Sequence, residues 1–360
     1  MRPSTAASIL VLALPTVSGC APCDDDAVCV IGEELPGGLL NVNAVAPDDV
    51  WLVGSSPDPV IAAGERPGPA ALHWDGVRWT AAATSAWDGV ELWAVWASPE
   101  QAVFVGTGGT ILELEVGTLV VTPVAGVPSD TTFFGIWGAS ADDLWAVGQT
   151  LSGEGPPALY RRREGLWAEW EPPILGRGEA GQIYFKVHGR SADDLWIVGS
   201  GGTALRWNGQ RLVKVPTDAD RDTSTEPLFT VHVHEGRTIA VGGASSGLIL
   251  EWDGGAWRDT SPLLLRGLNG ICAGPDGVFT AVGQAGTRAH LGETGWRSDQ
   301  DLEIEPVTSL DWHACDVASD GSLWTVGGRI AVRPLRQGVV AYTGPALPEL
   351  IESNAQSGGG

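Results

Sequence analysis

Hydrophobic and polar residues alternate along this chain in short runs that read as pairs of strands around a polar turn. In residues 133–148, Phe134, Ile136 and Trp137 precede a Ser-Ala-Asp-Asp turn, and a Leu-Trp-Ala-Val run then closes at Gly148. Alternation with a period of two, in segments rich in aromatic and β-branched residues, predicts strands rather than helices. The chain repeats this unit with variations, which predicts that the fold is built from repeated pairs of strands.

The number of repeats follows from the Val-Gly pair that closes the second strand. Its glycine recurs at intervals of 52, 42, 51, 43, 41 and 44 residues, at Gly54, Gly106, Gly148, Gly199, Gly242, Gly283 and Gly327. Two more short strands follow the glycine, and in three repeats they are joined by an Asp-Gly or Asn-Gly turn, a dipeptide that favours hairpins (Asp75-Gly76, Asn208-Gly209 and Asp253-Gly254). Such periods of about 40–50 residues predict an all-β fold, a seven-bladed β-propeller of four-stranded antiparallel blades. The repeat tryptophans, Trp145 among them, should be core residues.

The same repeat carries a family resemblance. Residues 137–148 match the degenerate pattern W-G-x-S-x-D-D-L-W-A-V-G fully, and residues 188–199 match it except at the first and third positions. The chain therefore resembles bacterial exported lipoproteins with propeller repeats of this kind, over about residues 40–344. The resemblance implies the fold and a location in the cell envelope, and it implies little about activity.

Composition and charge narrow the partners. The chain has 360 residues, with 50 Gly and 24 Pro against one Met, which disfavours a helical fold. Its formal net charge is −23. Such a surface repels phosphate backbones and anionic headgroups, so we expect no nucleic-acid partner.

The N-terminus is typical of an exported lipoprotein. A basic start at Arg2 precedes an apolar run from Ala6 to Val17, which is too short to span a bilayer. The run ends in Val-Ser-Gly-Cys, which resembles a lipobox and makes Cys20 the expected site of acylation. We expect residues 1–19 to be a signal peptide, 20–39 a lipidated tether, 40–345 the propeller and 346–360 a disordered tail. The protein would be a lipid-anchored monomer of the cell envelope, at the outer membrane, with no other membrane contact.

The remaining cysteines are even in number. Cys23 and Cys29 flank an acidic triplet, and a disulfide between them would be a local staple. Cys272 and Cys315 fall on the innermost strands of consecutive blades. They lie 11 and 12 residues before their closing glycines, so they face opposite sides of their own sheets and point either at each other or away. We expect a disulfide between the two blades.

Loop lengths predict a binding face. The turns between first and second strands and between third and fourth strands are short, and they define the short-turn face. Every insertion falls in the loops between second and third strands or in the links between blades, and these connections define the long-loop face, which in repeat proteins is often the binding face. The insertions are the loops Ser55–Ala71 and Gln149–Ala158 and the links Glu171–Tyr184, Pro216–Leu228 and Asp299–Ser309. Its candidate contact residues are Asp58, Glu65, Arg66, Glu154, Arg177, Glu179, Tyr184, Asp218, Arg221, Asp222 and Glu226.

Candidate chemistry is sparse. His232 and His234 are two apart on a strand and could face one side as a metal pair, but no third ligand is evident, so we expect no metal and no cofactor. No nucleophile elbow or phosphate-binding loop is present in the sequence. The favoured hypothesis is a non-catalytic envelope lipoprotein that binds a protein or a polysaccharide through the long-loop face. The alternatives are a propeller glycoside hydrolase or polysaccharide lyase, with loop carboxylates as acid and base, and a purely structural surface protein.

Overall fold

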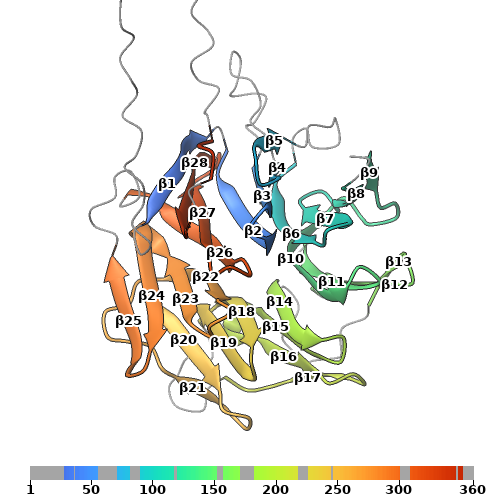
Figure 1. Ribbon diagram of the computed structural model, residues 1–360. Coiled ribbons are helices and arrows are strands. Elements are labelled where there is room, and N and C mark those ends of the chain that lie inside the picture. The colour runs from blue at the N-terminus through green and yellow to red at the C-terminus, as the bar shows by residue number, and fades with distance from the viewer. Residues whose placement is uncertain are drawn as a thin grey trace, which may run out of the picture.

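The computed structural model describes residues 28–35, 37–55, 71–81, 90–116, 120–151, 157–170, 182–217, 226–244, 246–300, 309–345 and 348–351. This part of the chain forms seven four-stranded antiparallel sheets. The innermost strands of neighbouring sheets contact one another all the way round, including the last sheet against the first, so the sheets are blades of a closed ring (Figure 1). The predicted seven-bladed β-propeller is confirmed.

The blades follow one another along the sequence, each built from its innermost strand outward. The first three are β2 (Leu39–Ala46), β3 (Asp49–Gly54), β4 (Ala71–Trp74) and β5 (Trp79–Ala81); β6 (Leu92–Ala97), β7 (Gln101–Gly106), β8 (Ile111–Glu115) and β9 (Val120–Pro123); and β10 (Thr131–Ser140), β11 (Asp143–Thr150), β12 (Leu159–Arg163) and β13 (Leu166–Glu169).

The next three blades have the same order. They are β14 (Tyr184–Ser191), β15 (Asp194–Gly199), β16 (Ala204–Trp207) and β17 (Leu212–Lys214); β18 (Leu228–His234), β19 (Arg237–Gly242), β20 (Leu248–Trp252) and β21 (Trp257–Asp259); and β22 (Leu268–Ala273), β23 (Phe279–Gly283), β24 (Thr287–Gly292) and β25 (Gly295–Gln300). Single 3₁₀ turns, η2 (Ser200–Gly202) and η3 (Gln284–Gly286), follow β15 and β23. Within the described ranges, no helix has the length and apolarity to cross a membrane.

The seventh blade is closed by the other end of the chain. It contains β26 (Asp311–Val317), β27 (Leu323–Arg329) and β28 (Arg336–Thr343), and its outer strand is β1 (Cys29–Leu35), which pairs with β28. The assignment of residues 20–39 to a tether was therefore wrong from Cys29 onward. These residues lack the repeat motif, but they carry apolar side chains that the blade edge buries, such as Ile31 at 2% exposure.

The chain end also packs on the ring. The backbone N–H of Ile351 donates to the carbonyl of Ile31 at 2.7 Å, and the Ile351 side chain contacts the core between blades seven and one. The predicted disordered tail from 346 is thus wrong for residues 348–351. Residues 346–347 and 352–360 lie outside the described part.

The core lies between blades rather than within them. Trp145 and Val147 of blade three pack with Val187 and Leu195 of blade four, and the other interfaces repeat this arrangement. Trp145 is fully buried, as its place in the repeat predicts. Each blade therefore depends on its neighbours for burial.

The aspartate of the Asp-Leu-Trp motif has a packing role that the sequence did not reveal. Asp143 accepts two hydrogen bonds from Arg161 on the next strand, at 2.8 and 2.7 Å. The guanidinium lies 4.4 Å from the centre of the Trp145 ring and is almost fully buried. In blade one His73 replaces Arg161, stacked on Trp51 and paired with Asp49. In blade three the motif thus fixes the Arg161 guanidinium against its buried tryptophan.

Candidate functional site

Every innermost strand carries a β-bulge at the same place. In blade three, Phe133 pairs with Gly148 and Gly135 pairs with Val147, so Phe134 between them has no partner. A Cβ atom on Gly148 would lie 1.9 Å from the Thr132 carbonyl, and this close approach explains why a glycine closes the second strand. The bulge re-aims one side chain per blade toward the axis of the ring.

These seven side chains form a ring that we call the channel collar. In blade order its members are Leu40, Trp93, Phe134, Phe185, Phe229, Asn269 and His313. Four consecutive members are aromatic. The ring centroids of Trp93 and Phe134 lie 4.9 Å apart, those of Phe134 and Phe185 5.9 Å, and those of Phe185 and Phe229 5.3 Å. The collar therefore presents an aromatic arc with a polar segment at Asn269 and His313.

The collar surrounds a cavity of about 330 Å³. Besides the collar, the cavity is lined by Gln284 and Asp311 at strand ends and by Ile330 and Ala331 in the loop between β27 and β28. All four lie where second strands end or first strands begin, so the cavity belongs to the long-loop face. Lys186, one residue after the collar position of blade four, also lines it.

A second ring of side chains lies deeper, at the position of Trp137, and we call it the lower ring. Its members are Asn43, Trp96, Trp137, His188, His232, Cys272 and Asp316. None of them lines the cavity. Several join their blade to the next: Asn43 accepts a hydrogen bond from the Ala97 N–H at 2.8 Å, and the Trp96 indole donates to the Gly138 carbonyl at 3.0 Å. The lower ring therefore lies on the short-turn side of the cavity and links neighbouring blades.

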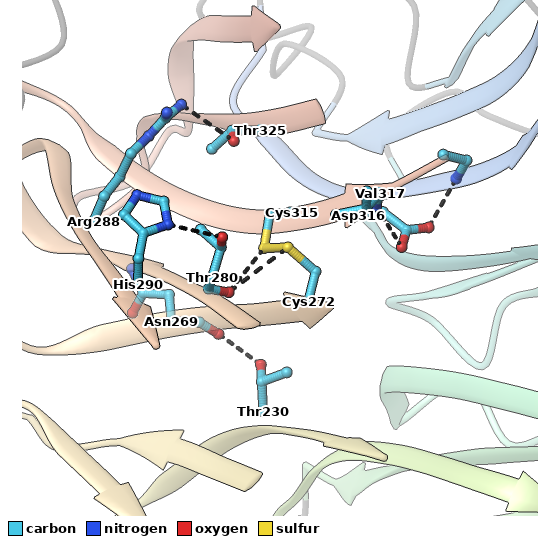
Figure 2. The surroundings of a disulfide bond; sticks show 11 residues. Thr230, Asn269, Cys272, Thr280, Arg288, His290, Cys315, Asp316, Val317 and Thr325 are labelled. Atoms are coloured by element: carbon cyan, nitrogen blue, oxygen red, sulfur yellow. Dashed lines mark hydrogen bonds between the residues drawn. A yellow bond between two sulfur atoms is a disulfide. The ribbon is translucent and has the colours of Figure 1, made fainter. Parts of the chain in front are cut away.

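A disulfide joins Cys272 of the lower ring to Cys315, which lines the cavity. Their Cα atoms are 5.7 Å apart, and the bond joins β22 of blade six to β26 of blade seven. Figure 2 shows the bond between the two strands, above Asn269 and Thr230 and beside Asp316. The predicted disulfide between blades is confirmed. Cys29 is also disulfide-bonded, while Cys23, its expected partner, and Cys20 lie outside the described residues.

The electrostatics of the channel are dominated by burial. Burial lowers the pKa of His188 well below its usual value and that of His232 to about 3, and the neighbouring His and Lys charges add to this effect. His188 accepts a hydrogen bond at Nδ1 from the Val233 N–H and stacks on His232, with ring centroids 4.1 Å apart. Burial also lowers the pKa of His313 to about 4. These imidazoles are therefore neutral at pH 7.

Two charged groups share the channel. Burial lowers the pKa of Lys186 to about 8, against the opposing effect of Asp316. Burial raises the pKa of Asp316, although its carboxylate accepts hydrogen bonds from the backbone of Ala44 and Val317 and from the Asn43 amide. Asp311 is the one carboxylate among the cavity-lining residues of the described chain. A glycosidase mechanism requires two carboxyl groups flanking one bond.

The sequence-based candidates fall in three groups. Nine lie outside the described residues, and they are Asp58, Glu65, Arg66, Glu154, Arg177, Glu179, Asp218, Arg221 and Asp222. Glu226 is described in the link before β18, where it accepts a hydrogen bond from the Ala244 N–H at 3.1 Å. Tyr184 was wrong as a surface contact, because it begins β14 and is fully buried between blades.

The collar itself was missed from sequence. In the sequence, each collar residue directly follows the residue that pairs with the closing glycine of its blade, as Phe134 follows Phe133. The only signal is that this position holds a large side chain in every blade. His232 and His234 lie on one strand as expected, with ring centroids 6.4 Å apart. Among the described residues, no group of three or more His, Cys, Asp or Glu side chains could hold a metal ion.

Comparison with known proteins supports the fold. No family model matches the chain, and no curated protein matches it. The WD40 β-propeller domain of Doa1 is similar in structure, with a TM-score of 0.63 at 11% identity over 88% of this chain and 97% of that one. The WD40 repeats of RRP9 give 0.63 at 12% identity over 89% and 98%, and YCF48 bound to D1 peptide gives 0.62 at 16% over 91% and 99%. The chain thus has the fold of a seven-bladed β-propeller, and its aromatic cavity belongs to its long-loop face.

Proposed function

We propose that this protein is a non-catalytic, lipid-anchored scaffold of the cell envelope that binds a protein partner through the long-loop face. The observation that carries the proposal is the channel collar, in which four aromatic side chains in consecutive blades line a cavity on that face. Aromatic side chains that remain accessible in a concave site are typical anchors for a partner. One structural neighbour, YCF48, is a propeller of similar size bound to a peptide, which adds support by analogy.

Exposed apolar side chains surround this site at a greater distance. In the links and loops of the long-loop face, Leu263 and Leu264 are 90% and 101% exposed, and Val332 is 66% exposed. Leu264 also has φ = 63°, a backbone conformation that a leucine adopts at a cost. Partner contact would bury these side chains. We therefore include them in the proposed interface.

The envelope location rests on the lipobox and on the path of the chain. Acylation of Cys20 would tether the protein through the residues that precede β1. Cys29 pairs with Tyr342 near the end of β28, so β1 begins at the short-turn face. A tether entering there leaves the cavity on the side of the ring opposite to the anchor. This arrangement favours a partner that approaches from the side opposite to the membrane.

A crosslinking pull-down from envelope extract tests the proposal. The double variant Leu263→Glu/Val332→Glu places charge on the long-loop face, and Val77→Glu/Leu166→Glu places the same charge on equally exposed positions of the short-turn face. We expect a specific protein to be captured by the intact chain and by the short-turn variant, and lost with the long-loop variant. Equal capture by both variants would refute the assignment of the face. A Cys20→Ala variant that still fractionates with membranes would refute the lipid anchor.

A further inference from the structure

Lys186 lies at an unusual position for a lysine, on an innermost strand of the ring. The chain has two lysines, and Lys186 lies on an innermost strand, where the other blades carry Asn41, Ala94, Gly135, Thr230, Gly270 or Ala314. Its charge acts on Asp316 and His313 of blade seven and on His188 and His232 of blades four and five. Lys186 is also one of the residues that line the channel cavity, one position after the collar member Phe185.

The ammonium group makes no hydrogen bond and no ion pair with the described residues, and Asp316 attracts it only at longer range, whereas other polar groups of the cavity have hydrogen-bond partners. Asn41 accepts from the Val95 N–H, and Asn269 donates to the Trp312 carbonyl. The hydroxyl of Thr230 donates to the Asn269 carbonyl at 2.6 Å. Gln284, Asp311 and His313 are likewise engaged, with Ala244, Ala285 and Leu40.

The second group without a described partner is also a donor. It is the indole N–H of Trp93, which is buried in the cavity wall. A buried charge without a direct ion pair is costly, and folded proteins usually pair such groups. The attraction of Asp316 offsets this cost only in part, because the pKa of Lys186 is still lowered. Two unmatched donors, one of them cationic, are complementary to a ligand that brings an anionic acceptor.

The remaining wall defines the rest of the ligand. Phe134, Phe185 and Phe229 with Trp93 and Leu40 offer apolar surface around the Lys186 ammonium. A volume of about 330 Å³ is at the lower end for a ligand site, which suits one aromatic or aliphatic group rather than an extended segment. The lower ring contributes no residue to the cavity wall, so a ligand in the cavity would contact the collar and Lys186 rather than the lower ring.

From this geometry we propose that the channel cavity binds an apolar carboxylate, with the carboxylate at Lys186 and the apolar body against the aromatic arc of the collar. The inference rests on the proposed function, because it names the chemistry that a partner would insert at the same face. A carboxylate on an apolar group can come from the last residue of a polypeptide or from a free aromatic acid. Both sources share the recognition chemistry, and both would place one apolar group against the collar.

The test measures binding of three probes to the full chain by titration calorimetry and ligand-observed NMR. The probes are acetyl-Ala-Ala-Phe with a free carboxylate, the same tripeptide as its C-terminal amide, and phenylacetate. We expect the free tripeptide to bind at least about tenfold more tightly than its amide, since hydrogen bonds to charged groups contribute that much. Tighter binding of the tripeptide than of phenylacetate would identify a chain end as the source, and the reverse order a free acid.

Two lysine variants make the test specific. Lys186→Met removes the charge but keeps a long apolar side chain, and it should abolish the preference for the acid over the amide. Lys214→Met removes the same charge from the outer strand β17 and should leave the preference unchanged. Circular dichroism melting confirms that each variant is folded.

Equal binding of acid and amide by the intact protein, or no binding of either carboxylate, would overturn the inference. Neither result depends on the envelope pull-down. Capture of a protein partner through the long-loop face without carboxylate recognition would retain the proposed function and remove only this inference.

Discussion

Removing the bond between Cys272 and Cys315 should cost about 4 kcal/mol of unfolding free energy. The two residues are separated by 43 positions, and a cross-link of that span restricts the unfolded chain by about this amount at 25 °C in the chain-entropy account. Removing the bond should change the native state little, because β22 and β26 are neighbouring innermost strands that contact each other without it. The stabilisation therefore acts chiefly through the unfolded state.

Urea unfolding of the wild type and of Cys272→Ala/Cys315→Ala measures the effect. Each protein is unfolded with and without reductant, because reductant also breaks the disulfide at Cys29. The effect of reductant on the double variant reports the Cys29 bond alone, and subtraction isolates the bond between the blades. Coincident transitions in circular dichroism and tryptophan fluorescence establish that a single free energy describes the unfolding. A loss below about 1 kcal/mol would refute the reasoning from loop length.

Three other predictions follow from the packing and the channel. Trp145→Ala should cost about 3–5 kcal/mol in urea unfolding, because the indole is fully buried between blades, and a cost below about 1 kcal/mol would contradict that packing. Asp143→Asn should lower the free energy of unfolding by about 3–5 kcal/mol, because it leaves the buried Arg161 charge without its carboxylate. The double variant Asp143→Asn/Arg161→Met should recover much of this loss in the same assay. A double variant less stable than the single one would count against the pairing. Carboxylate binding to the cavity should weaken as pH rises from 7 to 9, because Lys186 is charged below its pKa of about 8 and neutral above it. The other titratable groups that face the channel are His188, His232 and His313, which stay neutral over that range, and the carboxyl groups of Asp311 and Asp316. Unchanged affinity of acetyl-Ala-Ala-Phe in calorimetry across that range would remove Lys186 from the site.

The sequence predicted the features that repeat with a fixed period. The closing glycines gave seven blades because each one meets the carbonyl of its innermost strand in the same way, as Gly148 does with Thr132. The disulfide followed from a one-position offset between Cys272 and Cys315, which the paired registers of β22 and β26 reproduce. Period-two reasoning works wherever pairing is regular.

The sequence did not predict the features that depend on an irregularity or on a distant partner. The collar arises from bulges, and a bulge breaks the alternation by which a strand is read, so Phe134 and its equivalents looked like ordinary strand residues. β1 has no repeat motif and becomes a strand only against β28, which follows far later in the chain. No feature of the sequence distinguished Lys186, and its place in the cavity wall appears only once the ring of blades is closed.

The pairing of β1 with β28 has a consequence for the order of folding. The first strand of the propeller to be synthesised, Cys29–Leu35, must wait for about 300 further residues before its partner strand exists. At about 5–20 residues per second, that delay is on the order of 15–60 s. During it, the apolar edge of β1 and the unmatched faces of blades one and six lack their final neighbours. The ring closes last at a single seam, and the disulfide lies at the neighbouring interface, one blade before it, where it holds the seventh blade against the sixth.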